Sequence, residues 1–313
     1  MRFFHKFESI NFWFSGLVDG ILLSQKKKTQ YTRAIEYLEK YSYVLDDIKI
    51  QETSDKFQNK IWQLWLQGEG NMPSIVKKCH KTVKKFHSEN IILLTKENLK
   101  DYVDLPNYIE EKYKKGIISS AHYSDMVRLF LVAKYGGLWA DSTIFLTDKI
   151  PDEILKSDFF TFKSTESENL KFIQNLEQFK TYSNHLNAII TFGTSYFLGA
   201  KKGNLLINAM LSLLFEYWKN ENEACDYLFF DKFFNLAVLK NKECKKIFLN
   251  MPKYYLENAL MLQHALFEPF DEELFENIKQ ISPIHKLTHK NLHRNPYKNS
   301  FLNYLLNFEV KDV

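Results

Sequence analysis

The chain has 313 residues, which is long for one compact domain and short for three, since domains commonly hold roughly 100–200 residues. Hydrophobic residues make up 45% and charged residues 26% of the chain, a globular composition that excludes disordered and collagen-like chains. The net charge of +4 is too small to indicate a nucleic-acid-binding protein. The three cysteines show no CxxC spacing. We therefore expect reduced thiols and neither a zinc knuckle nor a redox motif.

The first 55 residues are predicted to be helical and charged. Residues 12–23 form an apolar stretch that Asp19 interrupts, too short for a membrane span of about 20 apolar residues. No small-residue cleavage site follows it, so a cleaved signal is not predicted. Three lysines, residues 26–28, come next. The segment therefore either packs on the domain as a helix or lies on an anionic membrane surface.

A strand–helix–strand unit is predicted between residues 60 and 94. Residues 60–66 are rich in Trp, Ile and Leu and predict a strand, and residues 67–71 predict a loop. Pro73 suits the first turn of a helix, and apolar residues then recur every three or four positions as far as Phe86. Residues 91–94 predict a short buried strand. Such a unit indicates a parallel sheet.

Further elements alternate along the rest of the chain. Ser119 and Ser120 can cap a helix over residues 121–134, which Gly136 and Gly137 end. The remaining expectations are a strand at 138–146 with an acidic break at Asp141, strands at 159–162 and 188–198, a helix at 205–218, and a mostly helical region from 225 with a polar loop at 282–290. The sequence predicts an α/β fold.

Residues 124–143 carry the strongest chemical signal. Asp125 and Arg128 are three residues apart, so they share one face of the predicted helix. Asp141 lies near the end of the following strand, where side chains meet ligands at the carboxyl edge of a sheet. A carboxylate there suits Mg²⁺ or Mn²⁺. Taken singly, the pair also fits a surface ion pair, and Asp141 also fits a turn.

Two runs in this segment, D-x-x-R-L and K-Y-G-G-L-W-x-D-x-T, resemble the capsular-polysaccharide-synthesis glycosyltransferases, relatives of glycosyltransferase family 32. Residues 60–65, 226–230 and 282–288 resemble further segments of that family, and the resemblance covers roughly residues 58–290. It implies a GT-A-type, Rossmann-like α/β sheet flanked by helices that binds a nucleotide sugar. We expect a helical segment at 1–55, the nucleotide-sugar-binding core at 56–220, and a mostly helical part at 221–313 that completes the acceptor and metal site.

The resemblance also implies site residues. Asp141, Thr143 and His285 would bind Mn²⁺ or Mg²⁺, although Thr143 stands where the family has a second Asp and His285 also fits a loop residue. Mn²⁺ accepts an imidazole ligand better than Mg²⁺ does. Besides Asp141, the catalytic candidates are Asp226 and Asp231, which alternatively are charges at a helix N-terminus. The candidates for binding the nucleotide sugar are Trp65, Gln67, Gly68, Asp125, Arg128, Gly137 and Lys286.

The function that the resemblance implies is a retaining, metal-assisted transfer of a sugar to a glycan or lipid-linked acceptor in bacterial surface polysaccharide synthesis. We expect a cytoplasmic hexosyltransferase that can contact the inner face of the membrane and binds no nucleic acid. One alternative is a non-catalytic protein of the same fold that binds a sugar nucleotide or glycan. The other is an adaptor for membrane surfaces or nucleic acid that uses the basic residues 26–28 and 290–298.

Overall fold

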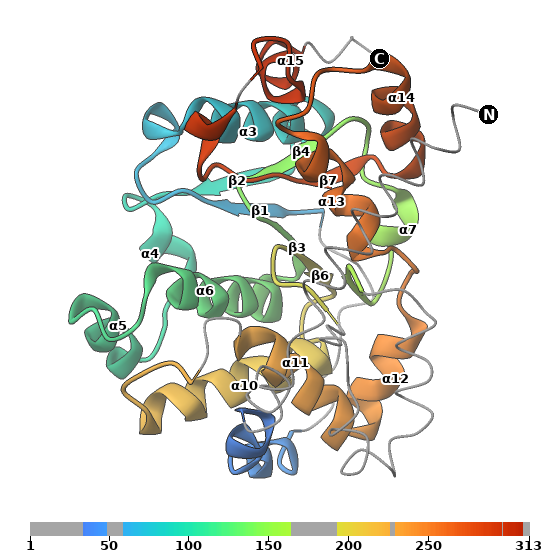
Figure 1. Ribbon diagram of the computed structural model, residues 1–313. Helices are drawn as coiled ribbons and strands as arrows, with labels where there is room; N and C mark the ends of the chain where they lie inside the picture. Colours follow the sequence, from blue (N-terminus) through green and yellow to red (C-terminus); the bar gives the residue numbers. More distant parts are fainter. Residues whose placement is uncertain (1–33, 49–58, 164–192, 226–228, 296, 309–313) are drawn as a thin grey trace.

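The computed structural model describes residues 34–48, 59–163, 193–225, 229–295 and 297–308, and it has a central sheet between two layers of helices (Figure 1). The strand order is β2-β1-β3-β6-β5. The strands are β1 (Ile61–Leu64), β2 (Ile91–Leu94), β3 (Gly137–Ala140), β5 (Phe159–Thr161) and β6 (Phe197–Ala200). Strand β1 pairs in parallel with β2 and β3, and β6 is antiparallel to β3 and β5. The predicted α/β class and the parallel strand–helix–strand unit are confirmed.

A second, two-stranded sheet corrects two predictions. The predicted strand at 138–146 is two strands, because the chain turns after Asp141 and enters β4 (Ile144–Leu146). The predicted polar loop at 282–290 contains β7 (Ile284–Lys286), which pairs antiparallel with β4. About 140 residues separate the two strands. Local sequence patterns cannot show a pairing over that separation, because each strand of three residues depends on its partner for backbone hydrogen bonds.

Helices cover both faces of the central sheet (Figure 1). The predicted helices are confirmed as α3 (Ser74–His87), α6 (Ser120–Tyr135) and α10 (Leu205–Asn220). Ser119 is the cap of α6, since its side chain accepts a hydrogen bond from the His122 backbone N–H. Gly136 follows α6 with φ of +70°, and a Cβ there would lie 2.8 Å from the Lys202 backbone nitrogen. Only glycine meets both constraints without strain.

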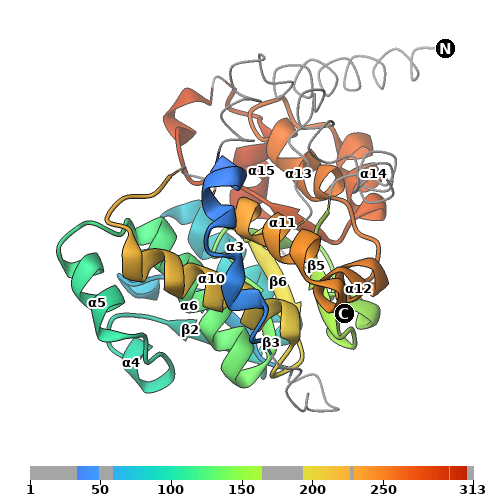
Figure 2. The same cartoon turned by 90° about the horizontal axis from the view of Figure 1, so that it is seen from below.

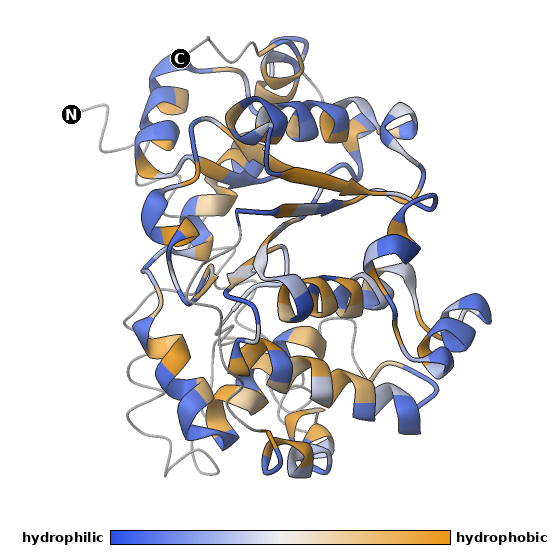
Figure 3. Cartoon of the chain, turned by 180° about the vertical axis from the view of Figure 1, so that it is seen from behind, coloured by the Kyte–Doolittle hydropathy of each residue, from blue (hydrophilic) through white to orange (hydrophobic). Residues whose placement is uncertain are grey.

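The remaining helices are mostly short and amphipathic, with hydrophilic and hydrophobic residues alternating along them (Figure 3). They are α4 (Leu99–Tyr102), α5 (Asn107–Lys114), α7 (Asp152–Leu155), α11 (Phe229–Lys240), α12 (Lys242–Asn250), α13 (Leu256–Ala265), α14 (Glu272–Ile281) and α15 (Phe301–Asn307), with 3₁₀ turns at Ser42–Leu45, Glu69–Asn71 and Leu292–Arg294. Helix α13 packs against β7, and α6 lies between the sheet and α10.

Some predictions fall outside the described residues. These are the apolar segment at 12–23, the lysines at 26–28, Asp226, and residues 188–192 of a predicted strand, whose described part is a strand only from Phe197, in β6. Among the helices that the structure describes, none is both long enough and apolar enough to cross a membrane.

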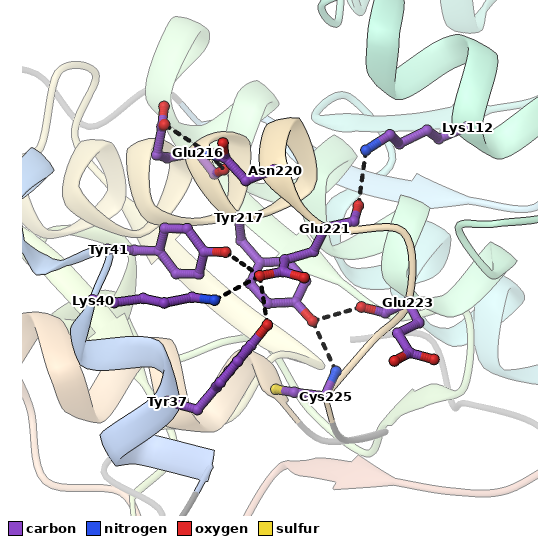
Figure 4. Close-up of polar contacts among 10 residues, drawn as sticks. All are labelled: Tyr37, Lys40, Tyr41, Lys112, Glu216, Tyr217, Asn220, Glu221, Glu223 and Cys225. Carbon is purple, nitrogen blue, oxygen red and sulfur yellow. Dashed lines mark hydrogen bonds and ion pairs between the residues drawn. The ribbon is translucent and has the colours of Figure 1, made fainter.

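Residues 34–48 cross the outer side of α10 (Figure 2). One carboxylate, that of Glu221, joins the two. It accepts hydrogen bonds from Tyr37 (2.5 Å), Lys40 (2.7 Å) and Tyr41 (Figure 4). Burial alone would raise the pKa of Glu221, but these three donors outweigh it and lower the pKa to about 2. The ionised carboxylate therefore stabilises the packing of the first described residues on the domain.

We expect Glu221→Gln to lower the free energy of unfolding at pH 7 by about 1–2 kcal/mol, because a neutral amide accepts these bonds less strongly. The carboxylate has a lower pKa in the folded than in the unfolded chain, so its contribution is complete above about pH 4.5 and is lost as the pH falls toward 2. Urea unfolding at several pH values measures this. Glu223→Gln is the matched control, since that side chain is exposed in the same loop. Equal losses in the two variants would contradict the prediction.

Candidate functional site

Asp141 lies directly after β3, at the carboxyl end of two parallel strands, β1 and β3. Its backbone N–H donates to the Tyr196 carbonyl (2.8 Å). Its own carbonyl accepts from the Gln63 side chain of β1 (3.4 Å) and from the Ile144 N–H (2.8 Å). The turn is therefore held by both neighbouring strands, and it positions the Asp141 carboxylate at the edge where open α/β sheets bind ligands.

The Asp141 carboxylate contacts positive or donating groups at both oxygens. The Trp139 indole N–H donates to Oδ1 (2.8 Å), and Arg128 Nη2 lies 3.6 Å from the same oxygen. Lys286 Nζ donates to Oδ2 (2.9 Å). Burial alone would raise the pKa of Asp141, but the charges of Lys286 and Arg128 lower it overall. The carboxylate is therefore ionised, and it holds two cations at one place.

Asp125 and Arg128 form a buried ion pair on α6 rather than a surface one. Arg128 Nη1 lies 2.8 Å from Asp125 Oδ1, and the two residues are only 6% and 7% exposed. Burial raises the pKa of Asp125 to about 6, although Arg128 opposes the shift. The guanidinium lies over the Trp139 ring, and its buried Nε has no hydrogen-bond partner among the described residues. Most buried donors in folded proteins have a partner, so this unsatisfied nitrogen is an exception.

Lys286 and His285 are neighbours on β7 that face opposite ways, as alternate residues of a strand do. Lys286 reaches Asp141 and the Thr143 hydroxyl (2.5 Å). His285 is fully buried, and its Nε2 is 3.1 Å from the Thr147 hydroxyl. The structure does not bring His285 together with Asp141 and Thr143, because the pairing with β4 turns its side chain toward Thr147.

The residues present do not fit a divalent metal ion. Asp141 Oδ2 and the Thr143 hydroxyl, the two predicted oxygen ligands, both contact the Lys286 ammonium group. The nearby Asp125 carboxylate is paired with Arg128. Within the described ranges no group of three or more His, Cys, Asp or Glu side chains is arranged to hold a metal. The use of Mn²⁺ or Mg²⁺ therefore stays a prediction.

The predicted nucleotide-binding residues separate into two places. Trp65, Gln67 and Gly68 follow β1 at its carboxyl end, which is the same edge of the sheet as Asp141. The Trp65 ring packs edge-on against His289, and Gly68 has a φ of +80°. Gly137 instead begins β3, four residues before Asp141. At about 3.3 Å per strand residue it lies roughly 13 Å away. The structure therefore does not bring Gly137 to the site, and its φ of +95° indicates a backbone role.

The charges of two catalytic candidates, Asp141 and Asp231, and of the unpredicted Glu257 act on the side chain of Tyr196, another unpredicted residue. Burial first, and then the charges of Glu257, Asp141 and Asp231, raise the pKa of the Tyr196 phenol. Asp231 follows Phe230 in α11, and the Phe230 ring lies 5.9 Å from the Arg128 guanidinium. Sequence reasoning missed Tyr196 and Glu257, because nothing in their local sequence shows that their segments fold against β3 and β7.

Gln63 is a third residue that the sequence analysis did not predict, although the sequence contains a signal for it. It is fully buried in β1, where a polar side chain interrupts the apolar run Ile-Trp-Gln-Leu. Its amide oxygen is 2.7 Å from His80 Nδ1, and His80 Nε2 is 4.0 Å from a Glu69 carboxylate oxygen. Buried polar groups need such partners. The chain of contacts links the loop after β1 to the Asp141 carbonyl.

The fold and the site thus define an α/β protein with a cluster of charged side chains at the carboxyl end of its parallel strands. Residues 21–305 match the family described as "Capsular polysaccharide synthesis protein", and the chain belongs to this family. No curated protein matches the sequence. Among solved structures, "PaToxG Glycosyltransferase" is similar over 84% of this chain and 100% of its own length, with 14% identity and a TM-score of 0.37. That likeness is distant.

We expect His285→Gln to flatten the dependence of stability on pH. Burial lowers the pKa of His285 to about 3 in the folded chain, so its neutral form stabilises the fold above about pH 6.5, and this contribution is lost as the pH falls from 6.5 toward 3. As the pH falls, the free energy of unfolding should decrease more steeply for the wild type than for His285→Gln. The two slopes should differ by at most about 1.4 kcal/mol per pH unit. Denaturant titrations between pH 7 and 4 measure it, with the exposed His293→Gln as control. Identical slopes for wild type and His285→Gln would contradict burial of a neutral imidazole.

Proposed function

We propose that this protein is a glycosyltransferase that moves a sugar, of the hexosyl type, from a nucleotide-diphosphate donor to a glycan or lipid-linked acceptor. The observation that carries the proposal is the convergence of Asp125, Arg128, Asp141 and Lys286 at one edge of the sheet. These residues come from α6, the turn after β3, and β7. Such a mixture of fixed cations and carboxylates suits a ligand that has both a diphosphate and sugar hydroxyls.

Each residue has a role that its contacts support. Arg128 has a planar guanidinium suited to paired hydrogen bonds with phosphate or sugar oxygens, and Asp125 orients it from one helical turn away. Asp141 holds both cations and can accept a sugar hydroxyl proton in a hydrogen bond. Asp231, whose charge raises the pKa of Tyr196, is a candidate for the acceptor side. Asp226 stays a prediction, because it lies outside the described residues. Family membership favours a product of surface polysaccharide synthesis.

Transfer with retention of configuration, as the resemblance to glycosyltransferase family 32 implies, is part of the proposal. It requires the acceptor oxygen to attack the sugar from the side of the departing diphosphate. The acceptor proton then passes to that diphosphate, and no protein nucleophile is needed. The contribution of the protein is to hold the donor and to stabilise the charge that develops on the leaving group.

A second candidate is a binding protein of the same fold that does not turn over its ligand. Thr143, at the position where the family has a second carboxylate, favours it, because a hydroxyl is neutral and a weaker ligand. A donor screen separates the two candidates. A panel of nucleotide sugars is incubated with the protein, with and without Mn²⁺, and both the released nucleoside diphosphate and the thermal shift are recorded. Release supports the transferase, and a shift without release supports the binding protein.

Asp141→Asn is expected to lower the rate of nucleoside diphosphate release about 10²–10³-fold, because the variant no longer holds Arg128 and Lys286 in place for the leaving group. The matched control is Asp152→Asn, an exposed aspartate on α7 that pairs with Lys156. It should stay within twofold of wild type. Melting temperatures confirm that both variants fold. Full activity in Asp141→Asn would overturn the proposal that this cluster of charged side chains is the catalytic centre.

A further inference from the structure

Lys286 lies at the point beside Asp141 where a cation would bind a diphosphate. Its ammonium nitrogen is 2.9 Å from Asp141 Oδ2 and 2.5 Å from the Thr143 hydroxyl oxygen. The side chain is 20% exposed, so it is mostly enclosed and still open to a ligand. Asp141 and Thr143 are the two oxygen ligands predicted for a metal. In this structure both contact a positive charge that belongs to the chain itself.

The position of Lys286 is set by the fold. Lys286 is directly opposite Ile144 in the β4–β7 ladder, and the Leu287 N–H next to it donates to the Thr143 carbonyl (3.0 Å). The backbone at residue 286 is therefore tied to the same turn that carries Asp141 and Thr143. A divalent ion between these two oxygens would have to displace the ammonium group from its carboxylate or share the site with a like charge, which is unfavourable.

We propose that Lys286 supplies the positive charge that a divalent cation supplies in related enzymes, so that this chain binds and activates its donor without a metal ion. The inference rests on the proposed transferase function. An ammonium group has three N–H donors, and Asp141 and Thr143 use two of them. The third binds an oxygen of the donor diphosphate.

Arg128 completes the arrangement from the other side of Asp141. It lies near Oδ1 of that carboxylate while Lys286 holds Oδ2. Asp141 is thus a bridge that sets the spacing of two cations. The buried Nε of Arg128, which has no partner in the described part of the chain, is a further donor for the same ligand. Two charged donors next to each other suit the several oxygens of a diphosphate better than one would.

In the transfer step, the bond between the sugar anomeric carbon and the diphosphate oxygen breaks, and its electron pair stays on that oxygen. The acceptor hydroxyl oxygen forms the new bond to the anomeric carbon. The hydroxyl proton passes to the departing diphosphate. Lys286 keeps its own proton throughout and stabilises the leaving group through a charge-assisted hydrogen bond.

The test measures binding of UDP, GDP, CDP and dTDP to the full chain by calorimetry, together with nucleoside diphosphate release from the corresponding sugar nucleotides. Both measurements, binding and release, are made once in EDTA and once in Mn²⁺. We expect the preferred nucleotide to bind with a dissociation constant that differs less than threefold between the two conditions, and release to continue in EDTA. A tenfold or greater loss of binding or release in EDTA would overturn the inference and leave the proposed transferase intact. Absence of binding and release in both conditions would overturn the transferase itself.

Lys286→Met removes the charge and keeps most of the side-chain volume. In EDTA it should weaken binding of the preferred nucleotide about 10–100-fold, the loss expected for one charge-assisted hydrogen bond. Lys279→Met on α14, a lysine of similar exposure that pairs with Glu276, is the matched control and should bind as wild type does. Wild-type affinity in Lys286→Met, with an unchanged melting temperature, would overturn the inference.

Charge reversal gives a readout that a structural role would not produce. In Lys286→Glu a second carboxylate joins Asp141 and Thr143, which creates the oxygen-rich set that Mn²⁺ prefers. We expect this variant to bind nucleotide at least tenfold more tightly with Mn²⁺ than with EDTA, unlike wild type. Equal and weak binding in both conditions by a folded Lys286→Glu would contradict a cation site at this position. The wild-type comparison in EDTA does not depend on either variant folding.

Discussion

The Asp141 carboxylate, shared between Arg128 and Lys286, is the interaction on which the site depends. It joins three elements that are far apart in the sequence: helix α6, the turn after β3 and strand β7. Removing charges from water is costly, and a buried carboxylate repays that cost only when cations and hydrogen-bond donors surround it. Trp139, which donates to Oδ1, completes its environment. The two positive groups are therefore fixed in the fold on either side of one carboxylate.

The scaffold around this carboxylate explains how it is held. The Gln63 side chain from β1 and the backbone of Tyr196 before β6 both contact the Asp141 backbone, so two neighbouring strands position one residue. The pair Asp125–Arg128 is buried on α6 against the aromatic rings of Trp139 and Phe230. The chain belongs to the capsular polysaccharide synthesis protein family.

Local patterns predicted much of this fold. The helices of α3, α6 and α10 and the strands β1 and β2 follow from residue periodicity, capping and glycine placement. The pairing of β4 with β7 could not be predicted, since β4 was part of a longer predicted strand and β7 lies in a predicted polar loop. The prediction of the site was limited in the same way, because the positions of His285 and Lys286 depend on that pairing. The sequence placed Asp141, Arg128 and Lys286 among its candidates through family resemblance, but it could not show that His285 faces Thr147 while Lys286 faces Asp141.

The pairing of β4 with β7 also has a consequence during synthesis of the protein. A ribosome completes the α6–β3 region long before it reaches residue 286, and the exit tunnel delays that residue further. Until then Asp141 and Thr143 have no ammonium partner, and β4 has no neighbouring strand. A nascent chain that ends before β7 therefore has an Asp141 carboxylate with only one of its two cations, Arg128. The arrangement of charges is complete only when β7 pairs with β4.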